Sequence, residues 1–269
     1  MIFSWWRSRR RRRIFARPFP DDWRDGLRED FPQYAWLDDA ERSRLERIAQ
    51  VLVAEKYWEG CAGFEIDDRV RVAIAAQAAM LLLGFDDAYY DSLTTVLVYP
   101  DTYVAPDAHM PGGGLVIEGH SPRLGEAWHR GPVILSWPDV LDGARIPDDG
   151  HNVVFHEFAH VLDMEDGLVD GTPRLGDRRL AAEWAAVMSD AQARLRRAAR
   201  RGTRTFLDDY GTRDEAEFFA VATESFFEQP ERMARNDQAL YDLLSRFYRQ
   251  DPIRRVQAAR QRGPKRERG

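Results

Sequence analysis

The sequence predicts an α+β fold in which a small sheet lies in the middle of the chain and helices precede and follow it. Apolar residues recur at helical spacing before residue 84 and again after residue 150, whereas short β-branched runs separated by Gly and Pro occupy the stretch between. Of the 269 residues, 44% are hydrophobic and 12% are aromatic, which is enough to fill a core. We therefore expect a folded globular protein.

Two helices are expected before the sheet. The first opens at Asp38–Asp39 and continues to about Lys56, with apolar residues at i, i+3 and i+4 positions. The second follows Asp67–Asp68. Its residues Val70–Leu83 are so rich in Ala, Val and Leu that we expect this helix to be buried nearly all round, at the centre of the core.

The residue pattern in the middle of the chain indicates short strands. Three β-branched or apolar runs predict them, at Thr95–Tyr99, Gly114–Ile117 and Pro132–Trp137. The glycine-rich segment Met110–Gly114 predicts a flexible connection and lacks the spacing of a phosphate-binding loop. Past residue 150 the helical pattern returns, and we expect helices at about 152–165, 178–200, 215–228 and 237–249.

Charge divides the chain into three parts. The net charge is −6, yet both ends are rich in arginine. We expect a flexible basic arm at residues 1–17, a single domain at 18–250 and a disordered basic tail at 251–269. Trp5 and Trp6, which precede the arginine run, raise the alternatives of an anionic membrane surface or nucleic acid, but a solvated arm is favoured.

Several classes of partner and location are disfavoured. The chain has no recognisable nucleic-acid motif and an acidic middle, so no nucleic-acid partner is expected. No run approaches the ~18 apolar residues of a membrane span. A single cysteine, Cys61, permits no internal disulfide, and the apolar start is too short for a signal peptide. We therefore expect a cytoplasmic protein.

His156, Glu157 and His160 form an H-E-x-x-H motif, the sequence form of a zinc hydrolase site. Residues i and i+4 of a helix lie on one side, about 6 Å apart at Cβ, so both imidazoles can bind one ion. Glu157 lies at the edge of that face, where a general base would reach an attacking water. An accidental match is the alternative, but the amphipathic helix expected around the motif favours the site.

A hydrolytic zinc site needs a third protein ligand and an open position. No histidine follows His160, so a carboxylate from another helix is expected. Thr212 with Glu215 fits a capping box, which would begin a helix near Thr212. Spacing alone does not choose among Glu215, Glu217 and Glu224.

The chain resembles a known family over nearly its whole length. The segments His156–Asp163 and Tyr210–Ala220 are similar to the catalytic domain of anthrax lethal factor and to the bacterial zinc peptidase family of Mlc titration factor A. The resemblance to the second family extends to further segments, at Pro18–Trp23, Glu59–Cys61, Ile74–Ala78, Val98–Pro100, Gly125–Trp128 and Gly131–Trp137.

The resemblance implies a zincin-like metallopeptidase domain with one zinc ion per chain. It assigns the metal ligands to His156, His160 and Glu217, the general base to Glu157, and an oxyanion donor to Tyr210. It also implies a peptide or protein substrate, with aminopeptidase and endopeptidase action both open, and a partner of the Mlc repressor type. The alternative function is a regulatory protein that sequesters a transcriptional repressor, with peptidase activity secondary.

Comparison with other zincins raises two further points, about the partner of the first histidine and about the strand that would bind the substrate. Many peptidases with a glutamate as third ligand carry an acid four residues later that orients the first histidine, whereas this chain has Val221 there. Asp163 and Glu224 are the candidates for that role. By resemblance to other zincins, Val133–Trp137 would bind the substrate backbone as an added strand, although the plain interpretation of this run is core.

Overall fold

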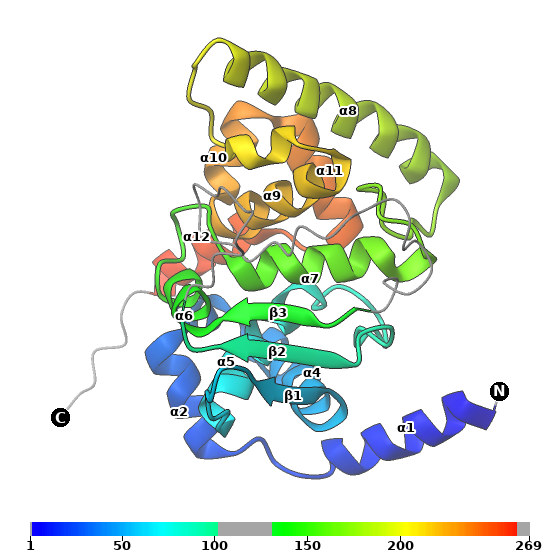
Figure 1. Ribbon diagram of the computed structural model, residues 1–269, viewed down its shortest axis with the longest axis vertical. Coiled ribbons are helices and arrows are strands. Elements are labelled where there is room, and N and C mark those ends of the chain that lie inside the picture. Colours follow the sequence, from blue (N-terminus) through cyan, green and yellow to red (C-terminus); the bar gives the residue numbers. More distant parts are fainter. Residues whose placement is uncertain (1, 102–130, 263–269) are drawn as a thin grey trace.

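The computed structural model describes residues 2–101 and 131–262 (Figure 1). The strand expected at Gly114–Ile117 and the connection expected at Met110–Gly114 lie outside these residues. Within them the fold is rich in helix, with one small sheet, as the sequence predicts.

The sheet has three parallel strands, β1 (Tyr57–Gly60), β2 (Thr95–Tyr99) and β3 (Val133–Ser136), in the order β1-β2-β3. Strands β2 and β3 agree with the predicted runs. Strand β1 is missing from the sequence-based prediction, because its four residues alternate between exposed and half-buried and include Glu59 and Gly60, which are poor strand formers.

Helices of the first half pack on the sheet and on one another. Helix α4 (Asp39–Glu55) begins with a complete capping box, in which Asp38 accepts from the Glu41 amide and Glu41 accepts from the Asp38 amide. Helix α5 (Asp68–Leu81) is buried from Val72 to Leu81 and forms the centre of the core, as its composition predicts. The shorter helices of this half are α2 (Asp21–Asp30) and α3 (Gln33–Trp36).

Helix α7 (Val153–Asp163) lies between the two halves of the molecule: β3 runs beside it on one side and helix α9 (Glu215–Glu228) on the other (Figure 1). Further helices of the second half are α6 (Trp137–Arg145), α8 (Arg178–Arg200), α10 (Pro230–Asn236) and α11 (Gln238–Tyr248), with 3-10 turns η1 (Met164–Asp166) and η2 (Asp209–Thr212).

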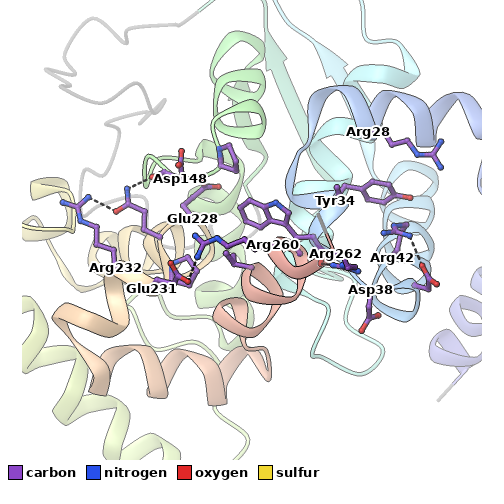
Figure 2. A pocket seen from close by; sticks show the side chains of 18 of the residues that line it. Arg28, Tyr34, Asp38, Arg42, Asp148, Glu228, Glu231, Arg232, Arg260 and Arg262 are labelled. Atoms are coloured by element: carbon purple, nitrogen blue, oxygen red, sulfur yellow. Dashed lines mark hydrogen bonds and ion pairs between the residues drawn. The ribbon is translucent and has the colours of Figure 1, made fainter. Parts of the chain in front are cut away.

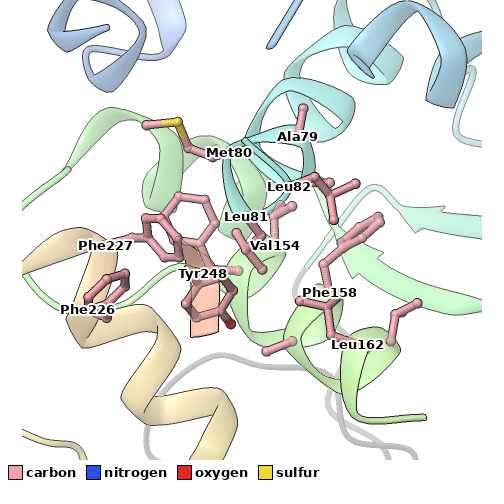
Figure 3. Close-up of a cluster of buried hydrophobic side chains, with 14 of the residues drawn as sticks. Ala79, Met80, Leu81, Leu82, Val154, Phe158, Leu162, Phe226, Phe227 and Tyr248 are labelled. Carbon is pink, nitrogen blue, oxygen red and sulfur yellow. The ribbon is translucent and has the colours of Figure 1, made fainter. Parts of the chain in front are cut away.

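One hydrophobic core joins the two halves. Figure 3 shows α5, α7, α9 and α11 meeting there through side chains that include Phe158, Phe227 and Tyr248. The Phe158 ring lies 4.8 Å from that of Tyr90, and the Phe227 ring 5.0 Å from that of Tyr248. Because α7 is held by this core on two sides, side chains on its remaining face have fixed positions.

The two basic ends are helical where the sequence favours flexible segments. Helix α1 (Ile2–Phe15) is held by Arg11, which pairs with Glu55 at 2.8 Å, and helix α12 (Pro252–Arg262) by Arg255, which pairs with Glu41 at 2.7 Å. Both partners lie far away in the sequence, so charge composition alone does not reveal them. In the described ranges 2–101 and 131–262, no helix combines the length and the apolar character that crossing a membrane requires.

Candidate metal centre

The start of α7 is fixed by Asn152, a fully buried helix cap. Its Oδ1 accepts from the Phe155 amide at 2.9 Å, which satisfies one of the free amides of the first turn. Its Nδ2 donates to Gln77 Oε1 on α5 and to the Gly143 carbonyl at the end of α6, each at 2.9 Å. Three helices therefore set the position from which the motif histidines project.

His156 and His160 point to the same side of α7, and Glu217 on α9 completes a group of three. The Nε2 atoms of the two histidines lie 3.2 Å apart, and Glu217 Oε2 lies 3.0 Å from His156 Nε2 and 3.4 Å from His160 Nε2. Glu217 is placed by Asp214, whose side chain accepts from the Glu217 amide at 2.9 Å.

The helix that carries Glu217 begins later than the Thr212–Glu215 capping box predicts. Thr212 belongs to the 3-10 turn η2, and Asp214 is the cap of α9. An aspartate is a strong N-cap in its own right, and Asp214 takes this role two residues after Thr212. The consequence is favourable for the site, because Glu217 then falls in the first turn, facing α7.

This donor set fits a small divalent metal ion. Bonds of roughly 2.0–2.1 Å to a tetrahedral ion place neighbouring ligand atoms about 3.3 Å apart. The three separations found here are 3.0, 3.2 and 3.4 Å. Among the described residues, His156, His160 and Glu217 are the group of His, Cys, Asp or Glu side chains whose ligand atoms lie close enough to share an ion.

Hydrogen bonds within the group shift the pKa values of His156 and Glu217 in opposite directions. Burial lowers the pKa of His156, but hydrogen bonds to Glu217 and Glu224 outweigh it and hold this pKa well above its ordinary value. Burial raises the pKa of Glu217, but hydrogen bonds from His156 and His160 outweigh it and hold that pKa below its ordinary value. Glu217 is therefore an anionic carboxylate in the site.

Of the two acids expected to orient a histidine, Glu224 does so. Its Oε1 lies 2.8 Å from His156 Nδ1, and its Oε2 accepts from the Asn152 amide at 2.7 Å. Asp163 instead accepts from the Gly171 amide at 2.9 Å, and its other oxygen has no hydrogen-bond partner in the described part of the chain. Burial raises the pKa of Asp163 to about 6.

Glu157 and Tyr210 flank the three-residue group. The Glu157 carboxylate is half-buried and makes no hydrogen bond to another described residue. Burial raises its pKa, which charge on His156 and His160 opposes. The Tyr210 hydroxyl lies 3.3 Å from Glu217 Oε1 and receives a 2.6 Å hydrogen bond from Arg213.

Sequence reasoning missed two contributors to this geometry. Asn152 is a residue type that favours helix caps, so its position before the motif indicates a cap. Its contact with Glu224, 72 residues away, cannot be derived from the local sequence. Arg213 is three residues from Tyr210, a spacing that places side chains together in a helical turn.

Glu215, one of the three acids among which spacing did not choose, lies outside the group. Its side chain is 63% exposed and pairs with Arg196 at 3.7 Å.

A pocket elsewhere is unrelated to these residues. It has a volume of about 1250 Å³ and opens between α3, α10 and α12 (Figure 2). Both acidic and basic side chains line it, and two ion pairs, Arg42–Asp39 and Arg260–Glu231, neutralise part of the charge. None of the motif residues, nor Tyr210 or Glu217, lines it, so its size does not mark it as the site of the chemistry.

Comparison with known proteins agrees with the site. The family model described as glucose-regulated metallo-peptidase M90 matches residues 4–249. The chain belongs to this family. It is 38% identical over 249 residues to an uncharacterized protein of Synechocystis sp., with 92% of this chain and 90% of the relative covered.

Named relatives point the same way. The chain is 32% identical over 239 residues to Mlc titration factor A of Serratia proteamaculans, with 87% of this chain and 89% of the relative covered. It is 30% identical over 238 residues to Mlc titration factor A of Yersinia pestis, with 87% and 86% covered. The resemblance to the Mlc titration factor A family that the sequence indicates is confirmed. The family is one of metallopeptidases, which implies a metal ion, and His156, His160 and Glu217 could bind it.

Proposed function

We propose that this chain is a zincin-like, zinc-dependent peptidase that binds one zinc ion through His156, His160 and Glu217. The observation that carries the proposal is the separation of their three ligand atoms by 3.0–3.4 Å, the spacing of neighbours around a tetrahedral ion. The donor set of two imidazoles and one carboxylate leaves a fourth position for the reaction, and its composition suits zinc.

Zinc, when bound, supplies a Lewis acid that makes water nucleophilic at neutral pH and polarises the substrate carbonyl. Glu157 acts as the general base: it takes a proton from the attacking water and later gives it to the leaving amine. Its lack of hydrogen bonds to other described residues supports both transfers, because the carboxylate is free to accept and return the proton.

Tyr210 stabilises the negative charge that develops on the carbonyl oxygen. The Arg213 guanidinium can only donate, so its 2.6 Å hydrogen bond uses a lone pair of the Tyr210 oxygen and leaves the phenol proton for another acceptor. The nearby Glu217 oxygen is 3.3 Å away, a long hydrogen bond that is readily exchanged for a stronger one to an oxyanion.

The substrate is a peptide or protein. Of the three described strands, β3 lies at one edge of the sheet and runs beside α7, which supports the expectation that a peptide backbone pairs with it. Digestion of peptide mixtures with free and with blocked N-termini distinguishes aminopeptidase from endopeptidase action. The lone Cys61 supports the cytoplasm as the place of this activity.

The alternative is a regulatory protein that sequesters a transcriptional repressor. The name Mlc titration factor A, carried by two relatives described above, favours a repressor of the Mlc type as a partner. Family membership among metallopeptidases favours peptide hydrolysis as the function of the site. A repressor partner is compatible with this activity, either as a regulator or as a substrate.

The experiment that tests the proposal is Glu157→Gln. We expect the variant to retain one zinc per chain and to lose peptidase activity by at least ~10²-fold, because the base is removed and the ligands are kept. The matched control is Glu215→Gln, at an exposed acid near the site, which should leave both quantities unchanged. Activity near the unmodified level in Glu157→Gln would disprove the base assignment.

A further inference from the structure

The basic helix α1 has two different faces, and the structure uses only one of them for packing. Arg7 and Arg11, one turn apart, point to the body of the protein. Arg7 pairs with Asp91 at 2.8 Å, and Arg11 pairs with Glu55 at 2.8 Å and with Asp91 at 2.5 Å. Arg10 adds a 2.9 Å hydrogen bond to the Ala54 carbonyl at the end of α4.

This anchoring fixes the rotation of α1 about its own axis. Arg11 is nearly fully buried, and its guanidinium lies 4.1 Å from the centre of the Tyr89 ring, so it cannot turn outward without breaking several contacts. Figure 1 shows α1 at the lower edge of the molecule, extending away from the sheet and the other helices. The side of α1 opposite Arg11 therefore faces solvent.

That outer face carries Trp5, Arg9, Arg12 and Arg13, which are at positions i, i+4, i+7 and i+8 of one helical stripe. All four side chains are exposed, and Trp5 is 49% exposed. The Arg9 guanidinium lies 5.2 Å from the centre of the Trp5 ring. Arg12 and Arg13 have no ion-pair partner in the part of the chain that the structure describes. We call this stripe the outer face of α1.

We propose that the outer face of α1 binds the surface of an anionic lipid bilayer. Arginine pairs with lipid phosphates through two parallel hydrogen bonds, and a tryptophan beside it has the amphipathic ring that prefers the depth of the headgroups. The protein as a whole carries a charge of −6, so an anionic surface repels most of the molecule. Attraction must come from a local cationic face, and this orients the protein with α1 against the lipid.

The combination favours lipid over nucleic acid. The arginines of the outer face alone would suit either phosphate-bearing surface. Trp5, an exposed aromatic residue one turn before Arg9, is stabilised when its ring enters the boundary between lipid headgroups and acyl chains. A nucleic-acid duplex presents phosphates and groove edges to such a helix and offers no comparable apolar region for the ring. Contact through a single helix and four side chains predicts reversible association, not insertion.

The test uses the full chain and vesicles of phosphatidylglycerol with phosphatidylcholine, with pure phosphatidylcholine vesicles for comparison, in co-sedimentation at low salt. We expect binding only to the anionic vesicles. The triple variant R9Q/R12Q/R13Q should bind about 10²-fold more weakly, because each arginine near an anionic surface adds a similar amount to the free energy of membrane binding. Trp5→Ala should weaken binding by about 3–10-fold.

The matched control removes three arginines from the other end of the molecule, R197Q/R200Q/R201Q at the exposed end of α8, with the same change in charge. This variant should bind like the unmodified chain. Equal losses in both triple variants, unchanged binding of R9Q/R12Q/R13Q or of Trp5→Ala, or preference for a 20-nucleotide RNA over vesicles would each overturn the proposal. Circular dichroism establishes that every variant is folded.

Discussion

Nδ1 of His156 lies 2.8 Å from Oε1 of Glu224, two turns along α9 from Glu217, which approaches Nε2 of the same ring. The two carboxylates thus hold one imidazole from opposite sides. Glu224 is held in turn by the Asn152 amide, at the cap of the helix that carries His156. The orientation of the ring is therefore set by a closed set of contacts between α7 and α9.

Glu224→Ala should weaken zinc binding about 10–100-fold, because an imidazole that loses the partner of its second nitrogen is a poorer and less oriented ligand. The measurement is zinc affinity by competition with a chromophoric chelator. Glu215→Ala, an exposed acid on the same helix, serves as the control and should bind zinc normally. Equal affinity of both variants would mean that Glu224 serves only packing.

Single alanine variants of His156, His160 and Glu217 should each lose most of the bound zinc, since two remaining ligands do not close a site. Metal analysis after gel filtration gives the stoichiometry directly. Glu215→Ala again provides the reference, with one zinc per chain expected. Full retention of zinc by Glu217→Ala would move the third ligand to another acid, with Glu224 as the nearest alternative.

Tyr210→Phe should lower kcat by about 10–10³-fold and leave KM and zinc content nearly unchanged, because it removes a donor used mainly in the transition state. The ring stays, so contacts with Arg213 through the aromatic face are retained. Steady-state kinetics on a cleaved peptide measure the effect. If Tyr210 serves only to pack η2, both kcat and the melting temperature will match those of the unmodified protein.

Glu228→Gln should stabilise the protein at neutral pH. The carboxyl is 2% exposed, accepts one hydrogen bond, from Gln33 at 2.8 Å, and has a second oxygen without a partner in the described ranges. Burial raises its pKa well above the ordinary value, and the charges of Asp149 and Glu224 act in the same direction. The folded state therefore binds this proton more tightly than the unfolded state does.

The sign of the pH dependence follows. A carboxyl whose pKa is raised on folding contributes its full stability below the unfolded pKa, and that contribution is lost as the pH rises toward the folded pKa. The gain in Tm from Glu228→Gln should be small near pH 4.5 and larger at pH 7.5. Each kcal/mol of added stability raises Tm by about 2–4 °C in a protein of this size. Thermal melts at both pH values measure it, with Glu29→Gln, 71% exposed, as the control. A gain that does not vary with pH would contradict the buried-carboxylate explanation.

The sequence predicted best what local signals determine. Helices are expected at 178–200 and 215–228 from apolar periodicity, and these are the bounds of α8 and α9, although the capping box placed the start of the second helix too early, near Thr212. Strand β1 is not predicted from the sequence, because four residues are too few to show a strand-like alternation. Its pairing partner β2 begins 38 residues later in the chain, so no nearby residues indicate the pairing.

Long-range contacts explain the remaining differences. The helical ends depend on the pairs Arg11–Glu55 and Arg255–Glu41, which connect residues 44 and 214 positions apart. In the candidate site, spacing placed the two histidines on one face, but the choice among the downstream acids depended on the packing of α9 against α7. Resemblance to a family supplied Glu217, and only the structure separated Glu224 from Asp163 as the partner of His156.

Glu217 meets His156 across 61 residues of sequence. A metal ion bound there would cross-link α7 to α9 and close a loop of that length in the folded chain, in the way that a disulfide does in a secreted domain. This chain has one cysteine and cannot use that device. The ion would thus act as a removable cross-link. Its chelation would loosen the junction between α7 and α9, and with it the contact between the two halves of the molecule.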